Sequence, residues 1–139
     1  MSDYFHMEMA PGDIGAISNL GLAHIGDAVY ELLVRVWLCE NGKATAGGLH
    51  RAAVKYVSAP AQAKAVRKIM SYLTETEQAA YKRGRNTRVG SVPKNASLEE
   101  YHAATGLEML FGYLYLKGET ERINELFRLI VEEDPAHAS

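Results

Sequence analysis

Apolar residues along this chain recur at spacings of three and four, the period of α-helices that pack one side against a core. No segment alternates apolar and polar residues as a half-buried β-strand does, and no repeat or low-complexity segment interrupts the pattern. The pattern therefore predicts an all-α fold. A length of 139 residues predicts a single domain with a real hydrophobic core.

The same spacing places the first three helices. The first runs from Leu22 to about Cys39, and Asn41-Gly42 ends it. Its predicted inward face comprises Leu22, Ile25, Val29, Leu32, Leu33 and Val36. A second helix covers residues 49–57 and stops near Pro60, and a third covers residues 61–73. The predicted inward residues of the third are Ala65, Ile69, Tyr72 and Leu73.

Two capping signatures mark the helices that follow. Thr74 with Glu77 opens a fourth helix, and Ser97 with Glu100 opens another that runs to about Leu116. The helix that ends near Leu116 is apolar on most sides and is expected to be central. A last amphipathic helix is predicted to bury Ile123, Leu126, Phe127, Ile130 and Val131. Residues 84–96 lack periodicity and are rich in turn formers, which predicts a long loop.

Composition and charge narrow the class of protein. A single cysteine, Cys39, cannot form an internal disulfide, and the chain shows neither a signal peptide nor a membrane-spanning run, so a cytoplasmic protein is expected. The net charge of −2 is unevenly distributed. Residues 41–98 hold eleven Lys and Arg against two acids, whereas the remainder holds four against fifteen. A basic middle favours a polyanion such as nucleic acid as partner, and a merely solvated basic face is the alternative.

Two acids stand in apolar surroundings far apart in the chain. Asp27 lies within Ile-Gly-Asp-Ala-Val, and Glu108 is the only formally charged residue between Glu100 and Lys117. A carboxylate in such a setting is costly unless it is paired, hydrogen-bonded or bound to a metal. Mg²⁺ bound between the two acids is one hypothesis, although spacing alone does not bring them together. Asp27 also shares a helix face with Glu31 and Arg35, where a surface salt-bridge ladder is the alternative.

The predicted loop supplies a second signal. Residues 81–95 contain five cations, two asparagines and no acid. Arginine matches the geometry of phosphate, and phosphate contacts dominate nucleic-acid affinity. The length of the loop favours RNA binding over a solubilising role.

Three segments together resemble the ribonuclease III family. Residues 19–30, Asn-Leu-Gly-Leu-Ala-His-Ile-Gly-Asp-Ala-Val-Tyr, are similar to its signature helix, and Thr-Gly-Leu-Glu at 105–108 resembles its second acidic motif. Lys-Arg-Gly-Arg-Asn at 82–86, followed by Pro-Lys-Asn at 93–95, resembles the loop of the short bacterial branch, mini-ribonuclease III. The resemblance covers about residues 19–116. It implies an N-terminal segment at 1–18 and a catalytic domain at 19–134, with no double-stranded RNA-binding domain.

The resemblance implies a helical homodimer that cleaves double-stranded RNA with Mg²⁺, leaves 5′-phosphate and 3′-hydroxyl ends, and matures the 23S ribosomal RNA precursor. Asp27 and Glu108 become the expected catalytic residues and metal ligands, with Thr105 and Glu31 in support. The expected RNA contacts are Lys82, Arg83, Arg85, Asn86, Arg88 and Lys94, and more weakly Arg51, Lys55 and Lys64.

The chain departs from full-length ribonuclease III at several positions. Leu20, Ala23, Thr105 and about Gly47 stand where that enzyme has acids, and His24 replaces a usual aromatic residue. Mini-ribonuclease III generally shares the simplifications of the acids. Two other functions stay open: a noncatalytic RNA-binding module of a ribosome-associated complex, and a helical protein-interaction domain. Retention of both Asp27 and Glu108 argues against the first, and the basic middle argues against the second.

Overall fold

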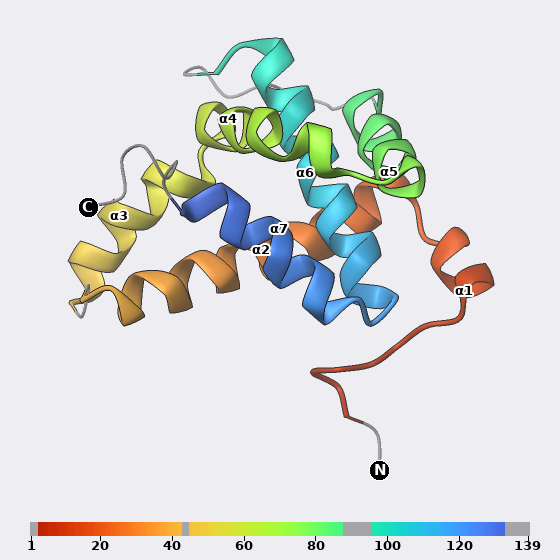
Figure 1. Ribbon diagram of the computed structural model, residues 1–139, viewed down its shortest axis with the longest axis horizontal. Helices are drawn as coiled ribbons and strands as arrows, with labels where there is room; N and C mark the ends of the chain where they lie inside the picture. Colours follow the sequence, from red (N-terminus) through yellow and green to blue (C-terminus); the bar gives the residue numbers. More distant parts are fainter. Residues whose placement is uncertain (1–2, 43–44, 88–95, 133–139) are drawn as a thin grey trace.

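A computed structural model describes residues 3–42, 45–87 and 96–132 of the chain, and Figure 1 shows their arrangement. The described residues contain helices and no strand, which confirms the predicted all-α fold. The helices are α1 (Pro11–Gly15), α2 (Asn19–Glu40), α3 (Ala46–Val57), α4 (Ala59–Ile69), the 3₁₀ helix η1 (Met70–Tyr72), α5 (Glu75–Arg85), α6 (Leu98–Leu116) and α7 (Thr120–Val131). None of these helices is long and apolar enough to cross a membrane.

Helix α6 is the centre of the fold, as its apolar sequence predicted. It packs against α2, α4, α5 and α7, and its most extensive contact is with α2 (Figure 1). Leu107, Leu110 and Phe111 are fully buried in it. Tyr30 of α2 meets the Phe111 ring edge-on, with ring centroids 5.3 Å apart. Because neighbouring helices cover α6 on several sides, it needs no polar face.

Glycines let α2 and α6 cross with their backbones in contact. A Cβ added to Gly26 would lie 1.5 Å from the Glu108 carbonyl oxygen, and one added to Gly112 would lie 2.0 Å from the Leu22 carbonyl oxygen. No side chain fits at either position. The residue after Gly26 is Asp27, so this crossing also brings the two sequence-predicted acids to the same place.

The predicted caps are present. Thr74 and Glu77 form a capping box at the start of α5, and Ser97 and Glu100 form one at the start of α6. Gly42, with φ of +92°, follows the end of α2. These contacts satisfy backbone groups that helix ends leave without intrahelical partners.

The predicted inward face of α2 is correct only in part. Leu22 is buried and Val29 and Leu33 pack against the core, but Leu32 is 45% and Val36 is 56% exposed. The buried stripe runs through Leu22, Tyr30, Val34 and Leu38, on the side of the helix where Gly26 meets α6.

Two other predictions are corrected in the connections. Tyr72, expected to point inward, is 57% exposed, because the third helix ends at Ile69 and continues as the 3₁₀ turn η1. The segment from Tyr81 to Arg85, placed in the basic loop, is the last part of α5. Tyr81 and Gly84 are buried there, and Gly84 packs against the α6 backbone.

Candidate active site

Asp27 and Glu108 meet where α2 crosses α6. Both carboxyl groups line one cavity of about 630 Å³ between α2, α6 and the junction of α3 with α4, close enough for the charge of Asp27 to act on Glu108. Asp27 is exposed, whereas Glu108 is mostly buried. Only Glu108 therefore shows the burial that the apolar sequence around both acids suggested.

The environment of Glu108 opposes a negative charge. Burial raises its pKa most, and the neighbouring charge of Asp27 raises it further, to about 8. Within the described part of the chain, neither acid forms an ion pair with Lys, Arg or His. Without a cation, Glu108 therefore holds a proton at neutral pH.

A buried amide that the sequence analysis missed supports Glu108. Gln62 of α4 is 2% exposed, and its Nε2 donates to Glu108 Oε2 at 3.4 Å and to the Val57 carbonyl oxygen at 2.9 Å. The sequence did carry a signal, since Gln62 stands three and seven residues before the inward Ala65 and Ile69. A polar side chain on an otherwise apolar helix face indicates a buried hydrogen bond.

The two supporting residues expected from the resemblance lie in different places. Thr105, one turn before Glu108, is buried and lines the same cavity, and its hydroxyl donates to the Tyr101 carbonyl oxygen at 3.1 Å. Glu31 does not line this cavity; its carboxylate lies 3.4 Å from the Arg35 guanidinium. The surface ion pair, one of the two readings of this helix face, is therefore present.

The basic residues expected to bind RNA lie on three helices. Arg51 and Lys55 are exposed on α3, Lys64 on α4, and Lys82, Arg83 and Arg85 on α5, with Asn86 next in the chain. Arg88 and Lys94 lie outside the described residues.

Asn19 fixes the end of α5 beside the start of α2. Its Oδ1 accepts from the Arg83 guanidinium at 3.2 Å, and its Nδ2 donates to the Thr87 hydroxyl at 3.1 Å. The first residue of the signature helix therefore holds one of the predicted RNA-binding arginines.

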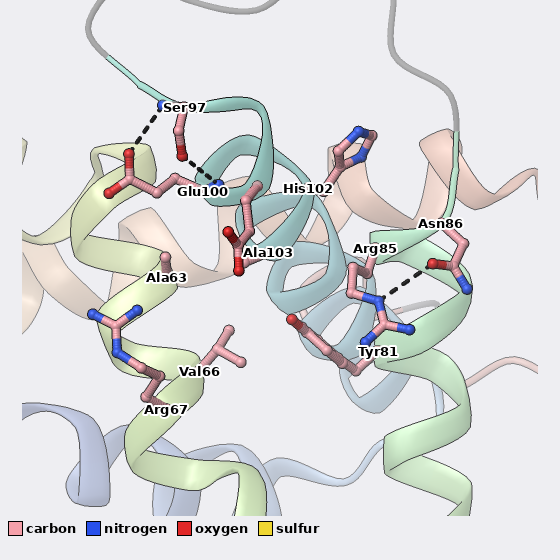
Figure 2. A pocket seen from close by; sticks show the side chains of 11 residues that line it. Ala63, Val66, Arg67, Tyr81, Arg85, Asn86, Ser97, Glu100, His102 and Ala103 are labelled. Carbon is pink, nitrogen blue, oxygen red and sulfur yellow. Dashed lines mark hydrogen bonds between the residues drawn. The ribbon is translucent and has the colours of Figure 1, made fainter.

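A second, larger cavity of about 1000 Å³ opens between α4, the end of α5 and the start of α6. Figure 2 shows Arg67 on one side of it and Arg85 on the other, with Arg85 hydrogen-bonded to Asn86. Glu99 and Glu100 also line this cavity, so its charge is mixed. His102 also lines this cavity (Figure 2).

The donor set suits a hard divalent cation. Two carboxylates that repel each other lose that repulsion when a cation binds between them, and Mg²⁺ commonly takes one or two carboxylates together with waters and phosphate oxygens. No group of three or more His, Cys, Asp or Glu side chains suited to a metal gathers among residues 3–42, 45–87 and 96–132. Asp27 and Glu108 fit an ion that keeps open positions for substrate.

The sequence profile of the ribonuclease III domain matches residues 20–119, so the chain belongs to the ribonuclease III family. Within that family it is similar to proteins named Mini-ribonuclease 3. It is 42% identical to the one from Clostridium tetani over 125 residues, which are 89% of this chain and 83% of that protein. It is 48% identical to the one from Symbiobacterium thermophilum over 109 residues, 78% of this chain and 84% of that protein.

A solved structure agrees with this placement. The crystal structure of a protein from Fusobacterium nucleatum matches the fold with a TM-score of 0.78 at 30% sequence identity. The match covers 86% of this chain and 95% of that one. The family profile and the relatives named Mini-ribonuclease 3 confirm the sequence resemblance to mini-ribonuclease III.

Proposed function

We propose that this protein is a metal-dependent endoribonuclease that cleaves double-stranded RNA and leaves 5′-phosphate and 3′-hydroxyl ends. The observation that carries the proposal is the Asp27–Glu108 carboxyl pair, held in a cavity without a neutralising side chain among the described residues. Membership of the ribonuclease III family and the name shared by the relatives support cleavage of RNA. The proposed substrate is the 23S ribosomal RNA precursor, processed in the cytoplasm.

Asp27 and Glu108 would hold Mg²⁺ through their carboxylate oxygens. When bound, the ion supplies positive charge to the scissile phosphate and a nucleophile at neutral pH. Glu108 would hold the ion as a carboxylate, and it would therefore have to release the proton that its buried position favours in the absence of a cation. The exposed position of Asp27 lets the RNA backbone approach the pair from solvent.

Two of the helices that line the Asp27–Glu108 cavity also carry exposed cations. Val54, Val57 and Pro60 line it from α3 and α4, the helices that carry Arg51, Lys55 and Lys64. Double-stranded RNA is recognised largely through phosphates and 2′-hydroxyls rather than base edges. Exposed cations on α3 and α4, the helices that line the carboxylate site, and on α5 suit such a ligand.

The outer face of α2 supports a homodimer. Leu32 and Val36 are exposed there, and two adjoining hollows of about 390 and 550 Å³ share Leu32, Leu33 and Asn124 in their linings. Asp27 lines one of these hollows as well as the acidic cavity. A two-fold partner on this face would cover apolar surface and place a second active site beside the first.

A cleavage assay on a long RNA duplex tests the proposal. The parent is expected to cut it with Mg²⁺ and not with chelator, and Asp27→Asn is expected to lose cutting while still shifting the duplex in a gel. RNA binding without metal-dependent cutting by the parent would replace the nuclease with a noncatalytic RNA-binding module. Size measurement in solution tests the dimer separately.

A further inference from the structure

The chain has two glutamines, and they occupy equivalent positions in their helices. Gln62 is four residues after the N-cap Ser58 of α4, and Gln78 is four residues after the N-cap Thr74 of α5. Each donates from Nε2 to a carbonyl oxygen five residues earlier, Gln62 to Val57 and Gln78 to Leu73. The shared contact is thus a local feature of the helix start.

Only Gln62 also reaches the acidic pair. Its Nε2 donates to Glu108 Oε2 at 3.4 Å. The contact with Val57 fixes which end of the amide does this, because a carbonyl oxygen accepts and cannot donate. Gln62 therefore presents an N–H, never a carbonyl oxygen, to the Glu108 carboxyl group.

The opposite end of the same amide carries a cost. Gln62 Oε1 is buried and accepts no hydrogen bond from any described residue. A buried acceptor without a donor destabilises a fold, and an apolar side chain of similar shape would avoid that penalty. The carbonyl contact does not account for the burial of this amide, since Gln78 makes the same contact at the mostly exposed start of α5.

We propose that Gln62 is a positioning residue for the metal site, and that its Nε2 holds one oxygen of Glu108 so that the other stays directed to the cation shared with Asp27. The inference rests on the proposed metal-dependent function. A donor fixed by the α3 carbonyl restricts rotation of the Glu108 side chain before the ion arrives. Hydrogen bonds to metal-ligating carboxylates typically change metal affinity by roughly 10- to 100-fold.

Mn²⁺ binding without RNA tests this role. The free Mn²⁺ signal in electron paramagnetic resonance is titrated against the parent, Gln62→Met and Gln62→Asn, with Gln78→Met as the matched control. Methionine keeps the shape and removes the donor, and asparagine keeps the amide but is too short to bridge Val57 and Glu108. Both Gln62 variants are expected to bind Mn²⁺ about tenfold more weakly, and Gln78→Met is expected to bind as the parent does.

Cleavage kinetics separate positioning from general damage. The Gln62 variants are expected to keep the KM for RNA and to recover kcat as Mn²⁺ is raised, which a distorted fold would not do. Unchanged Mn²⁺ affinity in both Gln62 variants, with binding lost in Asp27→Asn, would overturn the positioning role alone. Mn²⁺ binding by the parent that survives Asp27→Asn would overturn the metal site of the proposed function and this role with it.

Discussion

Two glutamates of this fold lie in sheltered positions and have opposite partners. Glu77, 5% exposed at the start of α5, accepts two hydrogen bonds of 2.8 Å from the Arg122 guanidinium of α7. Glu108, on the central helix α6, instead faces a second carboxyl group, that of Asp27. The first is neutralised by a side chain of the protein, whereas the second has no such partner among the described residues.

Their pKa values differ accordingly. Burial alone would raise the pKa of Glu77, but hydrogen bonds from Arg122 and Thr74 outweigh it, and the pKa lies below its ordinary value. Burial and the Asp27 charge raise the pKa of Glu108 to about 8. The Glu77–Arg122 ion pair is complete within the protein and is typical of a structural contact. A pair of carboxyl groups without a neighbouring cation is instead typical of a site that binds a ligand. Three substitutions test this contrast.

Gly26→Ala should have the largest effect, because it strikes the backbone under Glu108. The new Cβ would lie 1.5 Å from the Glu108 carbonyl oxygen, a clash that only separation of α2 and α6 can relieve. We expect a loss of more than about 4 kcal/mol in the free energy of unfolding. Urea denaturation measures it. Gly12→Ala is the control, since nothing lies within 4 Å of its added Cβ; similar stability of the two variants would contradict the close crossing.

Arg122→Met should remove the cation that neutralises Glu77 and leave that glutamate, like Glu108, without a positively charged partner. Removing one partner of a sheltered ion pair strands the other charge, and a loss of about 3–5 kcal/mol in the free energy of unfolding is expected. Cleavage per folded molecule should not change, because Arg122 is not a residue of the acidic cavity. Arg128→Met is the matched control, as its 3.7 Å pair with Glu132 is exposed and should contribute less than about 1 kcal/mol. Equal losses in the two variants would contradict a special role for the Glu77 pair.

Glu108→Gln should have the smallest effect on stability and should appear only as pH rises. Between the ordinary carboxyl pKa of 4.5 and about 8, the native protein retains a proton on Glu108 that the unfolded chain releases. Stability of the parent without divalent cation therefore falls with pH across this window. Glutamine abolishes that dependence, so the variant should become progressively more stable than the parent as the pH rises towards 8. Parallel pH profiles of unfolding in chelator would contradict the raised pKa.

Local patterns in the sequence predicted much of the fold. The capping boxes at Thr74 and Ser97 and the central position of α6 follow from residue types at fixed spacing, and the structure has them. The inward face of α2 followed only in part, because apolar residues lie around much of this helix and carry no local sign of which of them are buried. Gly26, in contact with Glu108, makes that choice, and it involves a partner more than 80 positions away.

The candidate site divides in the same way. Unusual surroundings in the sequence identified Asp27 and Glu108, whereas Gln62 belongs to the site through a contact between helices that no motif encodes. Gly84 is a common turn former, so the sequence predicts a loop where α5 continues to Arg85. In the structure, the absent side chain of Gly84 serves packing against α6.

The glycine crossing has a consequence for how the site can change. The separation of the two backbones that carry Asp27 and Glu108 is set by direct contact of main chain with main chain, and not by adjustable side-chain packing. Substitutions elsewhere in the core can change the stability of the contact between α2 and α6, but they do not change the spacing of the two helices at the crossing. Ligand preference at this site therefore has to be tuned by residues that touch the acids from outside the crossing, and α4 is the helix that supplies such a contact.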